Sequence, residues 1–169
     1  MVEDIIRIDG CKKPGLVTVE VGGAGEIATE EIIRGLHDAL RAVSLAMEDQ
    51  EILPGGGAIH TRIAHAVRAS SESEPGRARL AMEAFSRAME TIPGVLVENS
   101  GNDALDRILE LRTATRNQEY FMGIDKGGKV SVIERAWHPR TVITESLQLA
   151  CETTIGMLRI DQVISSRGD

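Results

Sequence analysis

The sequence feature that most constrains the fold is a proline followed by three glycines, at 54–57, between two helical patterns. Glycine loses more backbone freedom on folding than any other residue, so three in succession need a structural or functional reason. One interpretation is a sharp turn between two helices, which general grounds favour. The other is a ligand that approaches the N-terminus of the second helix closely. That terminus carries unpaired N–H groups and a partial positive charge, so the ligand would be an anion.

Apolar residues recur at three- and four-residue steps along most of the chain, which predicts helices. The first is expected over 28–49 with Thr29 as its N-cap, and the second follows the glycines. A third is expected over 77–91, a fourth is capped by Asp103, and the last follows Pro139. The segment between the third and fourth reads as a broken helix or tight turn. The apolar stripes expected to face inward comprise Ile32, Ile33, Leu36, Leu40, Val43, Met47, Ile59, Ile63, Ala66, Val67, Met82, Phe85, Met89, Ile92, Leu105, Ile108, Leu109, Leu111, Ile143, Leu147, Ala150 and Leu158.

Two short segment pairs have the composition of β-hairpins. Residues 4–8 and 16–21 are rich in β-branched side chains and flank a turn-forming stretch. A second hairpin is expected over 120–133, with its turn at 125–128. Only 2% of the 169 residues are aromatic, so the core must consist of aliphatic side chains, as in packed helices. The predicted fold is mainly α and multi-helical, with small β-hairpins.

Charge and composition exclude several classes of function. A net charge of −7 argues against a nucleic-acid partner, because phosphates are bound by clustered lysine and arginine. No apolar run approaches the roughly 20 residues that span a bilayer, and the first residues lack the pattern of a signal peptide. Cys11 and Cys151 lie far apart in different kinds of segment, which favours two thiols in a reducing cytosol over a disulfide. The chain is therefore expected to be cytoplasmic.

The spacing of residues along the chain identifies few candidates for a catalytic, metal-binding or phosphate-binding site. His60 and His65 are five residues apart, which on a helix places them about 140° from each other and does not suit one metal ion. No metal site is predicted. Asp38 lies almost opposite the apolar stripe of its helix, so periodicity alone indicates a solvated residue. The glycine run is not a Walker A loop, because no Gly-Lys-Ser/Thr follows it.

Five blocks of sequence nevertheless occur in an order and at spacings typical of one family. They are "LHDAL" (36–40), "LPGGGA" (53–58), "AMEAFSRAMETIPGVLVENSGND" (81–103), "LELR" (109–112) and "LRIDQVI" (158–164). The chain resembles the C-terminal part of a group II chaperonin subunit, the archaeal thermosome family related to the eukaryotic cytosolic chaperonin.

This resemblance implies a domain layout and a chaperonin equatorial-domain-like fold. Residues 1–25 correspond to the last strands of the substrate-binding apical domain, and 26–50 to a helix of the intermediate domain. Residues 51–169 correspond to the second half of the equatorial ATPase domain. The chain is then either a cloned fragment or a natural truncated chaperonin-like protein.

The resemblance also implies ATP and Mg²⁺ as cofactors. Asp38 matches the aspartate that positions the attacking water, and Gly55, Gly56 and Gly57 match the loop beside ribose and adenine. Asp125 matches a position near the adenine.

Two histidines depart from the family pattern. His138 stands where the family has an acidic residue that accepts hydrogen bonds from the ribose, and a neutral imidazole offers fewer acceptors. His60 likewise stands where the family favours glutamate. Both departures argue for weakened nucleotide binding.

The family's phosphate-binding motif, Gly-Asp-Gly-Thr-Thr, does not occur in these 169 residues. The expected function is that of a chaperonin-like protein, descended from ATP-dependent folding chaperonins, whose own ATPase is absent or very weak. The alternative is a non-enzymatic interaction or scaffold protein that self-associates or binds full-length chaperonin subunits. The expected partners are a second copy, most simply in a dimer, full-length subunits or unfolded polypeptides.

Overall fold

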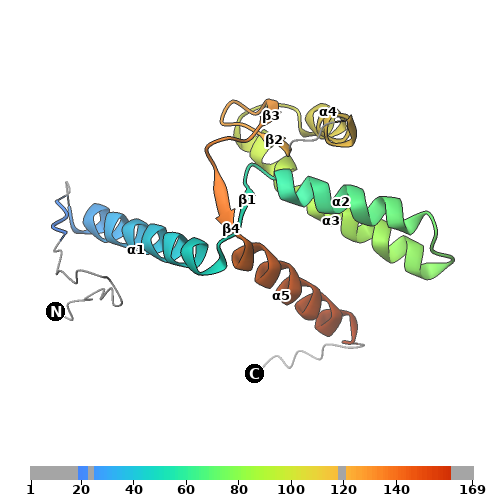
Figure 1. Cartoon of the computed structure of the whole chain (residues 1–169), viewed down its shortest axis with the longest axis horizontal. Coiled ribbons are helices and arrows are strands. Elements are labelled where there is room, and N and C mark those ends of the chain that lie inside the picture. The colour runs from blue at the N-terminus through green and yellow to red at the C-terminus, as the bar shows by residue number, and fades with distance from the viewer. Residues whose placement is uncertain (1–18, 23–24, 118–120, 161–169) are drawn as a thin grey trace, which may run out of the picture. The chain divides into compact units, whose positions relative to one another are not determined.

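The computed structural model describes residues 19–22, 25–117 and 121–160 (Figure 1). It confirms the mainly helical prediction. The elements are α1 (Glu26–Asp49), β1 (Ile52–Pro54), α2 (Ala58–Ser71), α3 (Arg77–Asn99), α4 (Ala104–Asn117), β2 (Met122–Ile124), β3 (Val130–Val132), β4 (Trp137–Pro139) and α5 (Arg140–Leu158). Two compact units, Met1–Arg41 and Ala42–Asp169, are each described by themselves. The first predicted hairpin falls mostly outside the described residues, and residues 19–21 are not in a strand.

Helix α1 begins two residues earlier than predicted. Thr29 is not its N-cap, because the Thr29 hydroxyl lies inside the helix and donates to the Gly25 carbonyl at 3.0 Å. The helix ends at Asp49, as predicted. No residue of α1 is buried, so its apolar stripe has no cover within the described part of the chain.

Helices α2 and α3 lie side by side and form the main packing contact of the second unit (Figure 1). The buried side chains of α2 are small or polar, among them Ala58, Thr61, Ala64 and Ser71. Of the predicted inward face of α2, Ile59, Ile63 and Val67 are partly buried and Ala66 is exposed, so this face is turned only partly inward. Small side chains at a helix contact allow the two helix axes to approach closely. The face of α2 that carries these small residues therefore packs against α3.

Helix α3 continues through Pro93, where the sequence predicted a break. A proline inside a helix removes one backbone hydrogen bond and normally destabilises it. Here Pro93 is buried, and its ring packs against the turn that precedes α2. A Cβ atom added to Gly57 would lie only 2.7 Å from the Cβ of Pro93. The buried contact offsets the lost hydrogen bond.

A buried carboxylate ties α2, α3 and α4 together. Glu90 of α3 is only 5% exposed and accepts hydrogen bonds from Arg68 of α2 and Arg112 of α4. Burial by itself favours the neutral acid, yet the bonds from Arg112 and Arg68 outweigh it and lower the pKa of Glu90. We call these three residues the Glu90 clamp.

Helix α4 and the β2–β3 hairpin complete the packed part of this unit. The Asp103 carboxylate accepts from the Asp106 amide at 3.1 Å, which confirms the predicted N-cap. Strands β2 and β3 pair antiparallel, as the sequence predicted for this hairpin. Val97, Leu111 and Ile124 form a buried cluster between α3, α4 and the hairpin. No described helix is long and apolar enough to cross a membrane.

Candidate functional site

The three glycines form a close-packed junction between β1 and α2. Gly56 and Gly57 have positive φ angles of 61° and 72°, which favour glycine. A Cβ on Gly56 would lie 2.6 Å from the Ile124 carbonyl oxygen, and the Ile124 amide donates to the Gly56 carbonyl at 2.8 Å. The space left by the missing side chains is therefore occupied by the protein's own atoms. The contact of these glycines with a nucleotide stays a prediction.

An open-sided pocket of about 490 Å³ lies beside this junction. Its lining comprises Gly56, Ile124, Asp125, Lys126, Gly127, Ser131, Val132, Ile133, Glu134, Arg135 and Ala136. Two residues that the sequence assigns to the nucleotide, Gly56 and Asp125, thus line the same pocket. The other lining residues belong to no sequence motif. They come together because β2 pairs with β3.

Asp125 holds the hairpin turn as well as lining the pocket. One carboxylate oxygen, Oδ1, accepts from the Gly127 amide at 2.8 Å and from the Lys129 amide at 2.9 Å. The Asp125 amide in turn donates to the Lys129 carbonyl at 2.9 Å. This use of Oδ1 fixes the side chain and leaves Oδ2 for other contacts.

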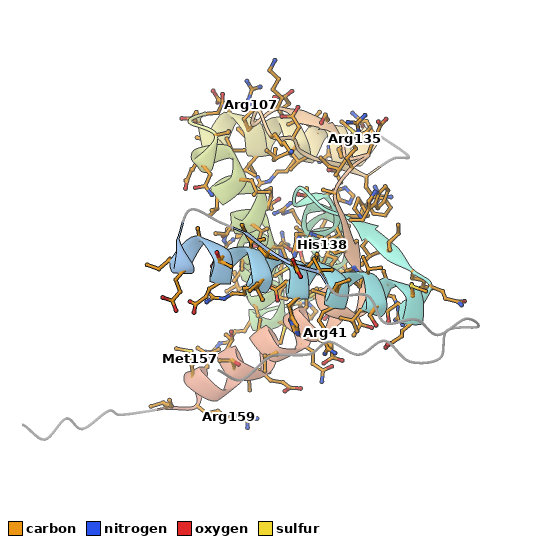
Figure 2. All side chains as sticks on the ribbon, turned by 90° about the vertical axis from the view of Figure 1, so that its left-hand side faces the viewer. Arg41, Arg107, Arg135, His138, Met157 and Arg159 are labelled. Carbon is orange, nitrogen blue, oxygen red and sulfur yellow. The ribbon has the colours of Figure 1, made fainter. Side chains whose placement is uncertain are left out.

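The two histidines that depart from the family pattern are His60 in α2 and His138 in β4. His60 is only 8% exposed, and its Nδ1 has no hydrogen-bond partner. Burial lowers the pKa of His60, and His138 lowers it further. His138, labelled in Figure 2, is half-buried, with its Nε2 only 3.3 Å from where a Cβ of Gly55 would lie. Sequence spacing missed this pair because the two residues are far apart in the chain.

Asp38 lies on α1 in the unit that is described separately, so its position relative to the pocket is not assigned. Its side chain is 77% exposed, and Oδ1 lies 3.8 Å from Nδ1 of His37. The exposure agrees with the solvated position that periodicity indicated. Among the described residues, no group of three or more histidine, cysteine, aspartate or glutamate side chains could hold a metal ion.

Comparison with known proteins gives one consistent result. A model of the TCP-1/cpn60 chaperonin family matches residues 2–167. The chain is 38% identical to thermosome subunit beta of Archaeoglobus fulgidus, over 98% of this chain and 31% of that subunit. It is 36% identical to a thermosome subunit of Methanocaldococcus jannaschii, over 96% of this chain and 31% of that subunit.

A solved structure is similar as well. The open-state monomer of a group II chaperonin from Methanococcoides burtonii gives a TM-score of 0.69 at 29% identity. The match covers 82% of this chain and 35% of that monomer. The chain thus spans about a third of the length of the relatives that it matches. A family match over nearly every residue, close relatives and a shared fold lead to one conclusion: the chain belongs to the TCP-1/cpn60 chaperonin family.

Proposed function

We propose that this chain binds ATP with Mg²⁺ in the pocket beside the glycine junction and acts with chaperonin subunits in protein folding in the cytoplasm. The observation that carries the proposal is that Gly56 and Asp125 line one pocket in a member of a chaperonin family. The residues after 50 then represent the second half of an equatorial ATPase domain.

The pocket suits the adenosine part of a nucleotide. Its volume of about 490 Å³ is within the range usual for small-molecule sites. Ile124, Val132 and Ile133 offer an apolar wall for a flat base, and Oδ2 of Asp125 offers an acceptor for an amino group. The charged lining residues are two basic ones, Lys126 and Arg135, and two acidic ones, Asp125 and Glu134, so their formal charges balance, which suits an uncharged adenosine group.

We further propose that the chain alone turns ATP over very slowly or not at all. Asp38 matches the family aspartate that positions the attacking water, and its side chain is exposed on α1. Phosphoryl transfer depends on positioning and charge stabilisation around the phosphates. The 169 residues contain no Gly-Asp-Gly-Thr-Thr motif to supply that positioning.

Calorimetric titration with Mg-ATP tests the binding. The informative variant is Val132→Glu, which places a bulky negative charge in the pocket at a side chain that is 43% exposed. The matched control is Val95→Glu, at a side chain that is 44% exposed on α3 and does not line the pocket. We expect binding by the parent and by the control, and strongly weakened binding by Val132→Glu. Absence of binding by the parent, or equal binding by both variants, contradicts the proposed site.

A phosphate-release assay tests the turnover. We expect a rate equal to that of a buffer blank for the isolated chain. Release above background that is lost in Asp38→Ala would show that the chain is an active ATPase.

Exposed apolar residues favour a second function, association with other chains. On α1, Ile32 and Val43 are 48% and 58% exposed, and on α5, Leu149 and Met157 are 65% and 67% exposed. Large apolar patches mark association surfaces, because burial contributes roughly 25 cal/mol per Å². The relatives are themselves named as subunits. We propose a homo-oligomer, most simply a dimer, with full-length chaperonin subunits and unfolded polypeptides as further partners.

A further inference from the structure

Two segments that are remote in the chain, 49–55 and 136–141, form a continuous ladder that we call the strap. At its centre, β1 and β4 pair antiparallel, with Leu53 opposite His138 (Figure 1). On one side of this pair, the Gly55 amide donates to the Ala136 carbonyl at 2.8 Å. On the other side, the Arg140 amide donates to the Glu51 carbonyl at 3.3 Å. The strap therefore extends beyond the short sheet at both ends.

The two ends of the strap differ in what they join. One end reaches the pocket, which Gly56 and Ala136 line. The other end joins Asp49, the last residue of α1, to Thr141 in the first turn of α5. Asp49 accepts from the Thr141 amide at 2.7 Å through Oδ2 and from the Thr141 hydroxyl at 2.6 Å through Oδ1.

These two bonds suit a carboxylate at a helix N-terminus. The first amides of a helix lack partners within it, and the helix dipole favours a negative charge there. The hydrogen bonds from the Thr141 side chain and amide lower the pKa of Asp49. Because each oxygen has its own donor, the carboxylate fixes the direction as well as the distance of the contact.

The chain between α1 and the strap is itself strained. Gln50 has a φ of 53°, a left-handed conformation that is unfavourable for a residue with a side chain. Such a conformation persists when the contacts on both sides fix it. Here the contacts are those of Asp49 before it and Glu51 after it.

We propose that Asp49 is a positioning residue that latches the C-terminal end of α1 to α5 and so couples α1 to the strap that reaches the pocket. Helix α1 cannot turn about Gln50 unless both bonds to Thr141 break. Without the latch, the backbone of Gln50 allows α1 to change direction while residues 51–55 stay paired with 136–140. This role does not depend on nucleotide binding, so failure of the proposed function leaves it testable.

The test measures how tightly α1 is held. Spin labels at Val43→Cys on α1 and Arg87→Cys on α3, with Cys11 and Cys151 replaced by serine, report the spread of distances by pulsed electron resonance. Both labelled positions are exposed. We expect Asp49→Ala to broaden the distribution and to speed hydrogen exchange at the Thr141 amide roughly tenfold or more. Exchange in α2 and α3 should stay unchanged, which separates a lost latch from general destabilisation.

Matched variants complete the design. Glu51→Gln removes the neighbouring ion pair to Arg140, whose side chains are 64% and 50% exposed, and should leave the distribution unchanged. Thr141→Ser keeps both donors and should behave as the parent. Thr141→Val keeps only the amide donor and should broaden the distribution partially, even if Asp49→Ala fails to fold. An unchanged width in Thr141→Val and Asp49→Ala, or equal broadening in Glu51→Gln, overturns the proposal.

Discussion

Replacement of Glu90 by glutamine probes the Glu90 clamp with a minimal change of shape. In the parent, both carboxylate oxygens accept from both arginines, through four N–H groups. In Glu90→Gln, one oxygen becomes an amide nitrogen that cannot accept from the arginine donors facing it. The variant also removes the negative charge between Arg68 and Arg112. We therefore expect destabilisation without a change of side-chain volume.

The magnitude follows from burial. Removing one partner of a buried ion pair costs about 3–5 kcal/mol. The arginine side chains are 34% and 40% exposed, so they regain some contact with water, and we expect the lower end, about 3 kcal/mol. With a urea dependence of about 2 kcal/mol per M, the unfolding midpoint should fall by about 1.5 M.

The matched control is Glu83→Gln on the same helix. Its ion pair with Arg79 is 2.9 Å long, but the two side chains are 31% and 52% exposed, so the loss should stay below about 1 kcal/mol. Urea unfolding at neutral pH, followed by circular dichroism, compares the two variants. Equal midpoints for Glu83→Gln and Glu90→Gln would refute the reasoning that burial makes the clamp strong.

The pH dependence gives an independent check. The pKa of Glu90 is lowered from its ordinary value of 4.5, so the unfolded chain takes up this proton before the folded chain does. The clamp contributes fully above about pH 4.5 and less as the pH falls through the folded pKa. The stability difference between the parent and Glu90→Gln should therefore shrink below that pH.

Three further predictions concern the junction, the buried histidine and association. Gly57→Ala should lower stability by about 3 kcal/mol in urea unfolding, because it adds a clash with Pro93 to the strain of a positive φ. Gly101→Ala, at a φ of 77° with open space after the end of α3, isolates the strain at about 1 kcal/mol, and equal losses would contradict the clash. Burial and His138 lower the pKa of His60 from 6.5, so the unfolded chain binds this proton first and stability should decline below that pH. In His60→Leu the midpoint should vary less between pH 7 and 5, and parallel profiles would contradict this. Light scattering after size exclusion should give the mass of a homo-oligomer, most simply a dimer, whereas a monodisperse monomer at tens of micromolar that binds no hydrophobic dye would contradict the expected association.

The helices could be predicted because their periodic patterns are long and local. The N-cap Asp103 and the hairpin turn could also be predicted, because each depends on hydrogen bonds between residues a few positions apart. The end of α3 was not, because a proline normally stops a helix and its compensating contact, Gly57, lies far away in the chain. The pairing of β1 with β4 also escaped prediction, as strands of three residues carry no periodic signal.

Some residues of the candidate site could likewise be predicted from the sequence, and others could not. The resemblance identified Gly56 and Asp125, and the fold brings these two to one pocket. The burial of His60 and the effect of His138 on its pKa were not predictable, because the two residues lie far apart in the chain. The hydrogen bonds between Asp49 and Thr141 could not be predicted either, because Thr141 follows 92 residues later in the chain.

The strap has a consequence for the order of folding. Contacts between distant residues pay a larger loop-closure entropy than local ones, so they tend to form late. Helices α2 and α3 adjoin in the chain and can pair early, whereas β1 must await β4. The strap and the pocket at its end should therefore assemble after the main rate-limiting barrier. A ligand that binds there would stabilise contacts absent from the folding transition state, and it would slow unfolding rather than accelerate folding.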